Sequence, residues 1–152
     1  MLKHALLFSS CLLVCGQLSS VAQTSGSSSK KTGDEIPVII LEGAAAYKDK
    51  GPDEAIKAWI KGSPIDGSKE ALSQANSLRQ IQDFYGPYQS MDLISSRNVT
   101  PKTRVLYFVF NFEKGPLFAK FVIYHSEQGW ILTTFNFNTK ADSILPGCQL
   151  ER

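Results

Sequence analysis

Apolar residues recur at helical spacing along the front half of the chain. Three helices are predicted: one over 37–48, one from Pro52 to a Gly-Ser-Pro stop at 62–64, and one from near Ser68 to Tyr85. Proline suits the first turn of a helix, and glycine accepts the conformation that ends one. The apolar residues expected on the buried sides of these helices are Pro37, Ile40, Leu41, Ala44, Tyr47, Ala55, Ile56, Trp59, Ile60, Ala71, Leu72, Ala75, Leu78, Ile81 and Tyr85.

From Tyr88 onward the apolar residues alternate with others, which is typical of strands. A first strand contains Met91 and Leu93, a loop covers 98–102, and a long apolar strand covers 103–113. A tight turn at Lys114-Gly115 then pairs this strand with the next. The turn is expected to set Phe112 opposite Leu117, Phe110 opposite Ala119, Phe108 opposite Phe121 and Leu106 opposite Ile123.

A loop at 127–129, in which Gly129 supplies a positive φ, leads to the last strand. Three loop residues place Phe121 opposite Phe135 and Ala119 opposite Phe137. A loop of two residues would turn the last strand over, because side chains alternate between the faces of a sheet. The longer loop is preferred, since it keeps Ile131 on the face of the phenylalanines.

The pairing divides the aromatic residues of 103–138 between two faces of the sheet. One face, with Phe108, Phe110, Phe121, Phe135 and Phe137, is expected to be covered by the helices. The other is half apolar and half hydrogen-bonding, and exceeds what a monomer usually leaves exposed. The sequence therefore predicts an α+β fold: three N-terminal helices packed on one face of a curved, cone-like antiparallel sheet of about four strands. The outer residues are expected to be Val105, Tyr107, Val109, Asn111, Phe118, Lys120, Val122, Tyr124, Trp130, Leu132, Thr134 and Asn136.

Three helices followed by a curved sheet resemble the nuclear transport factor 2-like superfamily, with its cystatin-like α+β cone. The resemblance covers most of 34–140, and the stretches Lys-Gly-Pro-Leu-Phe at 114–118 and Gly-Trp-Ile-Leu at 129–132 resemble small exported bacterial domains of that superfamily. It implies a cone-like pocket between helices and sheet, and an outer sheet face that often forms a dimer. Ketosteroid isomerase-like and dehydratase-like members place a carboxylate or histidine in that pocket.

The N-terminus resembles a secretory signal peptide: Lys3 precedes an apolar run over 5–15, and small residues lead to a cleavage site after Ala22. The run is shorter than the roughly 20 residues that span a bilayer. Lipoprotein processing at Cys15 is the alternative. The expected organisation is a signal peptide at 1–22, a flexible linker at 23–33, the α+β domain at 34–145 and a C-terminal tail at 146–152.

Charge and cysteine content follow from that cleavage. Loss of Lys3 lowers the basic count from 16 to 15 against 14 acidic residues, a balance that does not indicate nucleic-acid binding. Cys148 is then the one remaining thiol, so no intramolecular disulfide can form. In an exported protein such a thiol is either a small buried hydrophobe or pairs between chains.

No catalytic signature accompanies the aromatic strands. Asp92 and His125 are the candidate acid/base residues, against the plainer interpretation that both are solvated. One histidine and one cysteine in the mature chain cannot complete a usual metal site, and no cofactor motif occurs. The expected function is a non-enzymatic, exported module that binds a small apolar ligand or forms a homodimer through the outer sheet face. The alternative is a small pocket enzyme of hydrolase or isomerase/dehydratase type. The pocket or interface candidates are Tyr85, Tyr88, Tyr107, Phe118, Tyr124 and Trp130.

Overall fold

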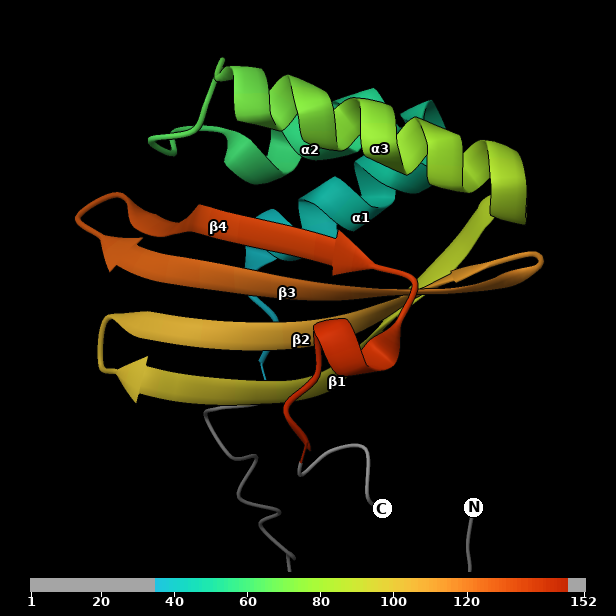
Figure 1. Cartoon of the computed structure of the whole chain (residues 1–152). Coiled ribbons are helices and arrows are strands. Elements are labelled where there is room, and N and C mark those ends of the chain that lie inside the picture. The colour runs from blue at the N-terminus through green and yellow to red at the C-terminus, as the bar shows by residue number, and fades with distance from the viewer. Residues whose placement is uncertain (1–34, 148–152) are drawn as a thin grey trace, which may run out of the picture.

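Three helices precede a curved, unclosed four-stranded antiparallel sheet in the computed structural model, which describes residues 35–147 (Figure 1). The strands follow one another in the order β1-β2-β3-β4. The α+β fold predicted from the sequence is thus confirmed, with its helices N-terminal to the sheet. The predicted signal peptide, its cleavage site after Ala22, the lipidation alternative at Cys15, the linker and Cys148 lie outside the described residues.

Proline and serine set the starts of the helices. α1 (Val38–Lys50) follows Pro37, α2 (Pro52–Ile60) has proline as its first residue, and α3 (Lys69–Tyr85) begins after Ser68. The Ser68 hydroxyl oxygen accepts a hydrogen bond of 3.1 Å from the main-chain N–H of Ala71, as an N-cap residue does.

Two leucines that were expected in the core are exposed instead. Leu41 lies outside the buried stripe of α1, which runs through Ile40, Gly43 and Tyr47. The stripe turns toward Gly43 because α2 packs there through Trp59. Leu72 of α3 is 63% exposed. The predicted stripe of α2, including Trp59, is fully buried.

The first hairpin is longer than predicted. β1 (Tyr88–Thr100) continues through the expected loop and pairs with β2 (Thr103–Phe112) up to Thr100 opposite Thr103. The prediction of a loop over 98–102 is therefore wrong for 98–100, and only Pro101 and Lys102 form the turn. Because Thr100 and Thr103 already face each other, two residues suffice to reverse the chain.

The second hairpin has a register two residues away from the predicted one. β2 pairs with β3 (Gly115–Ser126) so that Phe112 faces Gly115 and Phe110 faces Leu117. Gly115 belongs to the strand rather than to the turn, because the ring of Tyr85 lies over it: a Cβ atom there would be 2.6 Å from Tyr85 Cε1. A shift of two keeps every side chain on its predicted face.

The last hairpin combines both loop lengths considered from the sequence. β4 (Gly129–Asn138) starts after a two-residue turn, with Ser126 opposite Gly129, yet Phe135 faces Phe121 as predicted. A bulge at Thr133 absorbs the difference, and Thr133 Oγ1 donates a hydrogen bond of 3.0 Å to the carbonyl oxygen of Val122.

The bulge changes which side chains of early β4 face the helices. Leu132 pairs with Ile123, and both are fully buried. Ile131 pairs with Tyr124, whose neighbour along β3 is the buried Ile123, so Ile131 lies on the outer face. The predicted outer positions of Leu132 and Trp130 and the predicted inner position of Ile131 are wrong, because the two-residue turn inverts this part of the strand.

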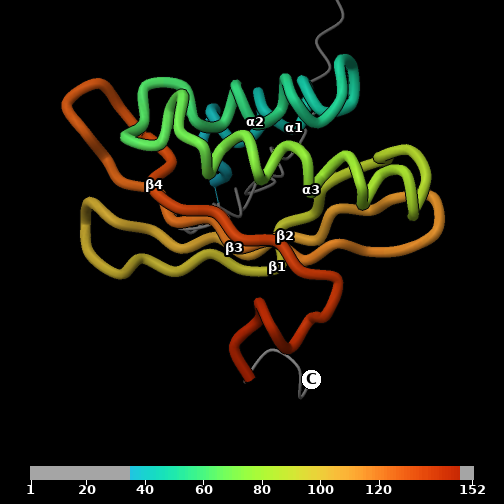
Figure 2. Tube along the Cα trace, turned by 45° about the horizontal axis from the view of Figure 1, so that its top comes forward, coloured from blue at the N-terminus to red at the C-terminus, as the bar shows by residue number. Residues whose placement is uncertain are grey.

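The helices cover one face of the sheet, and the chain after β4 crosses to the other. Figures 1 and 2 both place the short helix η1 (Ala141–Ser143) on the side opposite α1, α2 and α3. Ile144 and Leu145, which follow it, are half-buried. The segment after β4 therefore lies on the outer side of the sheet (Figures 1 and 2).

Candidate functional site

Aromatic side chains fill the space between the helices and the sheet, where the cone-like pocket was expected. Trp59 lies fully buried at the centre, stacked on Phe110 with ring centroids 5.6 Å apart, and the edge-on ring of Phe121 lies 5.3 Å away. Phe137 closes the group, 5.8 Å from Phe110. Such close packing stabilises the fold.

A groove of about 670 Å³ runs between α2 and α3. Its apolar lining comes from the exposed Leu72 and from the edges of Ile56 and Ile60 on α2 and of Ala71 and Ala75 on α3, which are otherwise buried. Ala71 and Ala75 lie one helical turn apart, and their small side chains do not extend far from α3. The groove between α3 and α2 therefore stays open. The remaining lining residues are mostly charged or polar: Asp53, Glu54, Lys57, Asp66, Gly67, Ser68 and Lys69.

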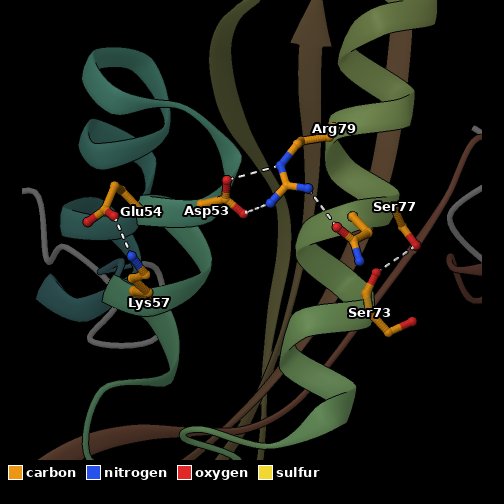
Figure 3. A network of polar contacts seen from close by, with 7 residues as sticks. Asp53, Glu54, Lys57, Ser73, Ser77 and Arg79 are labelled. Carbon is orange, nitrogen blue, oxygen red and sulfur yellow. Dashed lines mark hydrogen bonds and ion pairs between the residues drawn. The ribbon is translucent and has the colours of Figure 1, made fainter.

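An ion pair joins the two helices at the end of this groove (Figure 3). Arg79 of α3 donates from Nε to Asp53 Oδ2 over 3.0 Å and from Nη2 to Asp53 Oδ1, so the contact is bidentate. Nη1 donates to Asn76 Oδ1 over 2.6 Å. The hydrogen bond to Asp53 raises the pKa of Arg79. By contrast, Lys57 pairs with Glu54 within α2, which raises the pKa of Lys57 and joins no second element.

A second cleft, of about 430 Å³, lies where the chain enters α1. Arg104 forms part of its wall and is 7% exposed. Its Nη2 donates to the main-chain carbonyl oxygen of Glu35 over 3.1 Å and to Ser96 Oγ over 2.8 Å. Its guanidinium carbon lies 5.6 Å from the ring centroid of Trp130, within range of a cation–π contact. Arg104 thereby ties the start of α1 to the sheet.

The candidate acid/base residues lie on opposite faces of the sheet. Asp92 pairs with the outer residue Val109 and accepts a hydrogen bond of 2.6 Å from Asn111 Nδ2. His125 is exposed at the end of β3, edge-on to Trp130 at 5.0 Å. The structure does not bring Asp92 and His125 together.

The six aromatic candidates separate into four places. Tyr107, Phe118 and Tyr124 lie on the outer face of the sheet, since their strand neighbours point to the core. Tyr85 lines a cleft of about 350 Å³ between the end of α3 and Thr139. Tyr88 packs on Tyr47 with ring centroids 4.5 Å apart, and Trp130 belongs to the cleft of Arg104.

Two tyrosines have perturbed hydroxyl groups. Burial raises the pKa of Tyr47, and the neighbouring Tyr88 adds to the shift. Burial, together with the charge of Asp92, raises the pKa of Tyr88 to about 12. Both hydroxyls are thus protonated at neutral pH, in which state they are poor bases.

The outer sheet face has an apolar centre between polar edges. In three successive rows across the middle strands, Val105 pairs with Val122, Tyr107 with Lys120 and Val109 with Phe118, so that Lys120 is the one charged residue among these six. The edge strands contribute Asp92, Arg97, Thr134, Asn136 and Asn138 to the same rows. An apolar centre with a polar rim is the arrangement that protein interfaces show.

Within residues 35–147 no three His, Cys, Asp or Glu side chains gather closely enough to hold a metal ion. Among the helices of the same residues, none has the length and apolar character needed to cross a membrane. Comparison of the chain with protein-family models, curated proteins and solved structures finds no match.

Sequence reasoning missed the groove between α2 and α3. Leu72 was assigned to the buried stripe of α3, so that side of the helix was expected to be filled. The signal was present in Ala71 and Ala75, which are small residues facing the larger Ile56 and Ile60 across the helix pair. Two small residues one turn apart predict a loosely filled contact with a neighbouring element. Which helix lies opposite them is decided by the tertiary packing.

Proposed function

We propose that this chain is an exported, non-enzymatic binding domain that holds a compact apolar molecule in the groove between α2 and α3. The observation that carries the proposal is the apolar floor of this groove, whose volume of about 670 Å³ lies in the range of small-molecule sites. The filled cone and the separation of Asp92 from His125 favour binding over the alternative of a pocket enzyme with an acid or base in the cone.

The dimensions of the groove limit the ligand. The stretch of α2 that lines it, from Asp53 to Ile60, is about 10 Å long at the rise of an α-helix. Asp66 and Gly67 line the end beside the α2–α3 loop, and Asp53 is held by Arg79 at the other. A ligand of one or two fused rings fits this length better than an extended acyl chain.

Fluorescence titration with N-phenyl-1-naphthylamine, an uncharged aromatic probe, tests the proposal. The unaltered domain is expected to bind the probe saturably. Ala71→Leu adds a side chain to the floor and is expected to weaken binding about tenfold, the effect of roughly 1.4 kcal/mol. Ala45→Leu makes the same change on an exposed side of α1 and serves as the matched control. Absence of saturable binding, or equal binding by both variants, would contradict the proposal.

Self-association through the outer sheet face is the second candidate. It is favoured by the Val105–Val122 and Val109–Phe118 pairs at the centre of β2 and β3 and by the polar residues of the edge strands β1 and β4. Sedimentation should then show a dimer whose dissociation constant rises at least tenfold in Val122→Glu or Tyr107→Glu. Leu72→Glu removes an exposed apolar side chain elsewhere and is the control. A strict monomer at high micromolar concentration contradicts the dimer.

Export and family membership belong to the same proposal. The leader at 1–22 supports cleavage after Ala22, and the element order supports membership of the nuclear transport factor 2-like superfamily. Mass spectrometry of the protein from its native host tests export directly. A mature chain that starts at Gln23 supports it, a lipid on Cys15 supports the anchored alternative, and a retained leader rules out both.

A further inference from the structure

The helix that forms one wall of the groove is held to the domain by few side chains. Only Ala71, Ala75 and Leu78 of its 17 residues are buried, and two of these are alanines. Phe84 is 74% exposed at its far end. The shorter α2 buries five of its nine residues, including Trp59. Because burial of apolar area is the main stabilising term, α3 contributes less to the core than its length suggests.

The two ends of α3 differ in how they are attached. At its C-terminal end, Lys114 N donates to the carbonyl oxygen of Tyr85 over 2.8 Å, and the Tyr85 ring lies against Gly115. In the loop before its N-terminal end, Ile65 packs against the core, but Gly62 and Gly67 on either side of it are both at positive φ and have no neighbouring atoms where a Cβ would lie. A helix anchored at one end and joined to a glycine-containing loop at the other can pivot about its anchored end.

The bidentate contact between Asp53 and Arg79 spans the gap between the helices (Figure 3). It joins positions 26 apart in the sequence, whereas the nearby Glu54–Lys57 pair stays within one turn of α2. Arg79 follows Leu78, the last buried residue of α3. The ion pair therefore holds α3 at mid-length, between its anchored end and the groove.

We propose that the Asp53–Arg79 ion pair is a clasp that holds α3, the wall of the groove that carries Ala71 and Ala75, close to α2. In this proposal α3 acts as a hinged lid at the side of the groove, and release of the ion pair widens the groove and lets the ligand enter. The lid rests on the proposed ligand-binding function, because it controls access to the same site. The motion separates Ala71 and Ala75 from Ile56 and Ile60 while the anchored end at Tyr85 stays in place.

Hydrogen exchange without any ligand tests the clasp by itself. Arg79→Ala and Asp53→Ala are each expected to speed exchange of the α3 amides from Ala75 to Leu78 about fivefold, as for loss of a well-formed ion pair. The double variant should exchange no faster than either single variant, because both remove the same contact. The amides of Leu106 and Phe108 in β2 report global unfolding and should not change. Lys57→Ala, which removes only the pair within α2, should leave α3 unaffected. Unchanged exchange in Arg79→Ala, or an equal rise in β2, overturns the clasp.

Stopped-flow mixing with N-phenyl-1-naphthylamine tests the lid. Arg79→Ala is expected to raise the association rate constant by a factor similar to the rise in exchange, because a larger fraction of molecules is open. Faster exchange with an unchanged association rate overturns the lid. Absence of saturable probe binding by the unaltered domain overturns the binding function itself, while the exchange result still decides the clasp.

Discussion

The ring of Trp59 occupies the space that a side chain at Gly43 would need. A Cβ atom on Gly43 would lie 2.0 Å from Trp59 Nε1. The same nitrogen donates a hydrogen bond of 3.0 Å to the main-chain carbonyl oxygen of Ile40. α1 and α2 thus meet across a gap that only glycine leaves open, and the backbone of α1 fixes the indole that forms the centre of the aromatic core.

Gly43→Ala is expected to lower the free energy of unfolding by about 3 kcal/mol, since the indole must shift or lose its hydrogen bond. The loss should appear although alanine favours a helix by about 1 kcal/mol over glycine. Urea unfolding gives the value. Ala45→Gly, on the exposed side of the same helix, measures only the difference in helix propensity between alanine and glycine. Equal stability of Gly43→Ala and the parent domain would mean that the two helices do not pack in this way.

Tyr47→Phe is expected to stabilise the domain by about 1 kcal/mol. The hydroxyl of Tyr47 is buried without a hydrogen-bond partner among the described residues, so its removal relieves a desolvation cost. Thermal and urea unfolding of the variant measure the gain. Tyr88→Phe is the control, because Tyr88 is only half-buried and should change stability by less than about 0.5 kcal/mol. A marked loss of stability in Tyr47→Phe contradicts the prediction.

Alkaline pH is expected to destabilise the fold through the same two tyrosines. Burial raises the pKa of Tyr47 above its ordinary value and that of Tyr88 to about 12. In the unfolded chain both hydroxyls lose their protons near the ordinary tyrosine pKa of about 10. The folded state therefore binds more protons above that pH, and the free energy of unfolding falls as pH rises from about 10 toward 12.

Unfolding midpoints in urea at intervals between pH 8 and pH 12 measure that fall. The double variant Tyr47→Phe/Tyr88→Phe should show a flatter profile, because it lacks both hydroxyls. A parent profile that is flat up to pH 12 would contradict the burial of these groups.

Arg104→Ala is expected to cost about 2 kcal/mol, because the variant loses hydrogen bonds to Glu35 and Ser96 and the contact with Trp130. Arg104→Lys should recover less than half, since lysine lacks the planar fork of donors. Arg97→Ala removes an exposed arginine of the same sheet and should be nearly neutral. Equal effects at positions 104 and 97 would show that Arg104 does not hold the start of α1.

Thr133→Val is expected to lower the free energy of unfolding by about 1 kcal/mol. The variant keeps the shape of the side chain but loses the hydrogen bond to the carbonyl oxygen of Val122 at the bulge. Thr134→Val changes an exposed neighbour outside the bulge and should be neutral or slightly stabilising. A neutral result for Thr133→Val would mean that the bulge does not depend on this contact.

The predictable parts of the fold were those that follow from local spacing. Pro52 and Ser68 marked helix starts correctly, and the stripe of α2 through Trp59 is buried as expected. The faces of Phe108, Phe110, Phe121 and Phe135 were also correct, because a register shift of two preserves a face. Turn positions were less predictable: the sequence predicts Gly115 as a turn residue, whereas in the structure it lies in β3 and makes room for the ring of Tyr85.

The candidate site was predictable only in part. Tyr107 and Phe118 lie on the outer face as expected, because no bulge intervenes between them and the paired core residues. Trp130 lies on the helix-covered face and not on the predicted outer face. The extra residue at Thr133 inverts the side-chain directions in the part of β4 that precedes it. Nothing in local spacing revealed the contact of Asp53 with Arg79, whose side chains come from two helices separated by a loop.

The sequence by itself determined the order of three helices and four strands, the α+β class and the membership of most of the core, because helical and strand periodicities are local properties of the chain. Tertiary structure alone decided that Trp59 lies over Gly43, that aromatic rings pack between the helices and the sheet and that a groove opens beside Ala71 and Ala75. These features depend on the volumes of side chains brought together from distant positions. Spacing along the chain specifies which side of an element is apolar, but how closely two such sides approach depends on how their particular side chains fit together.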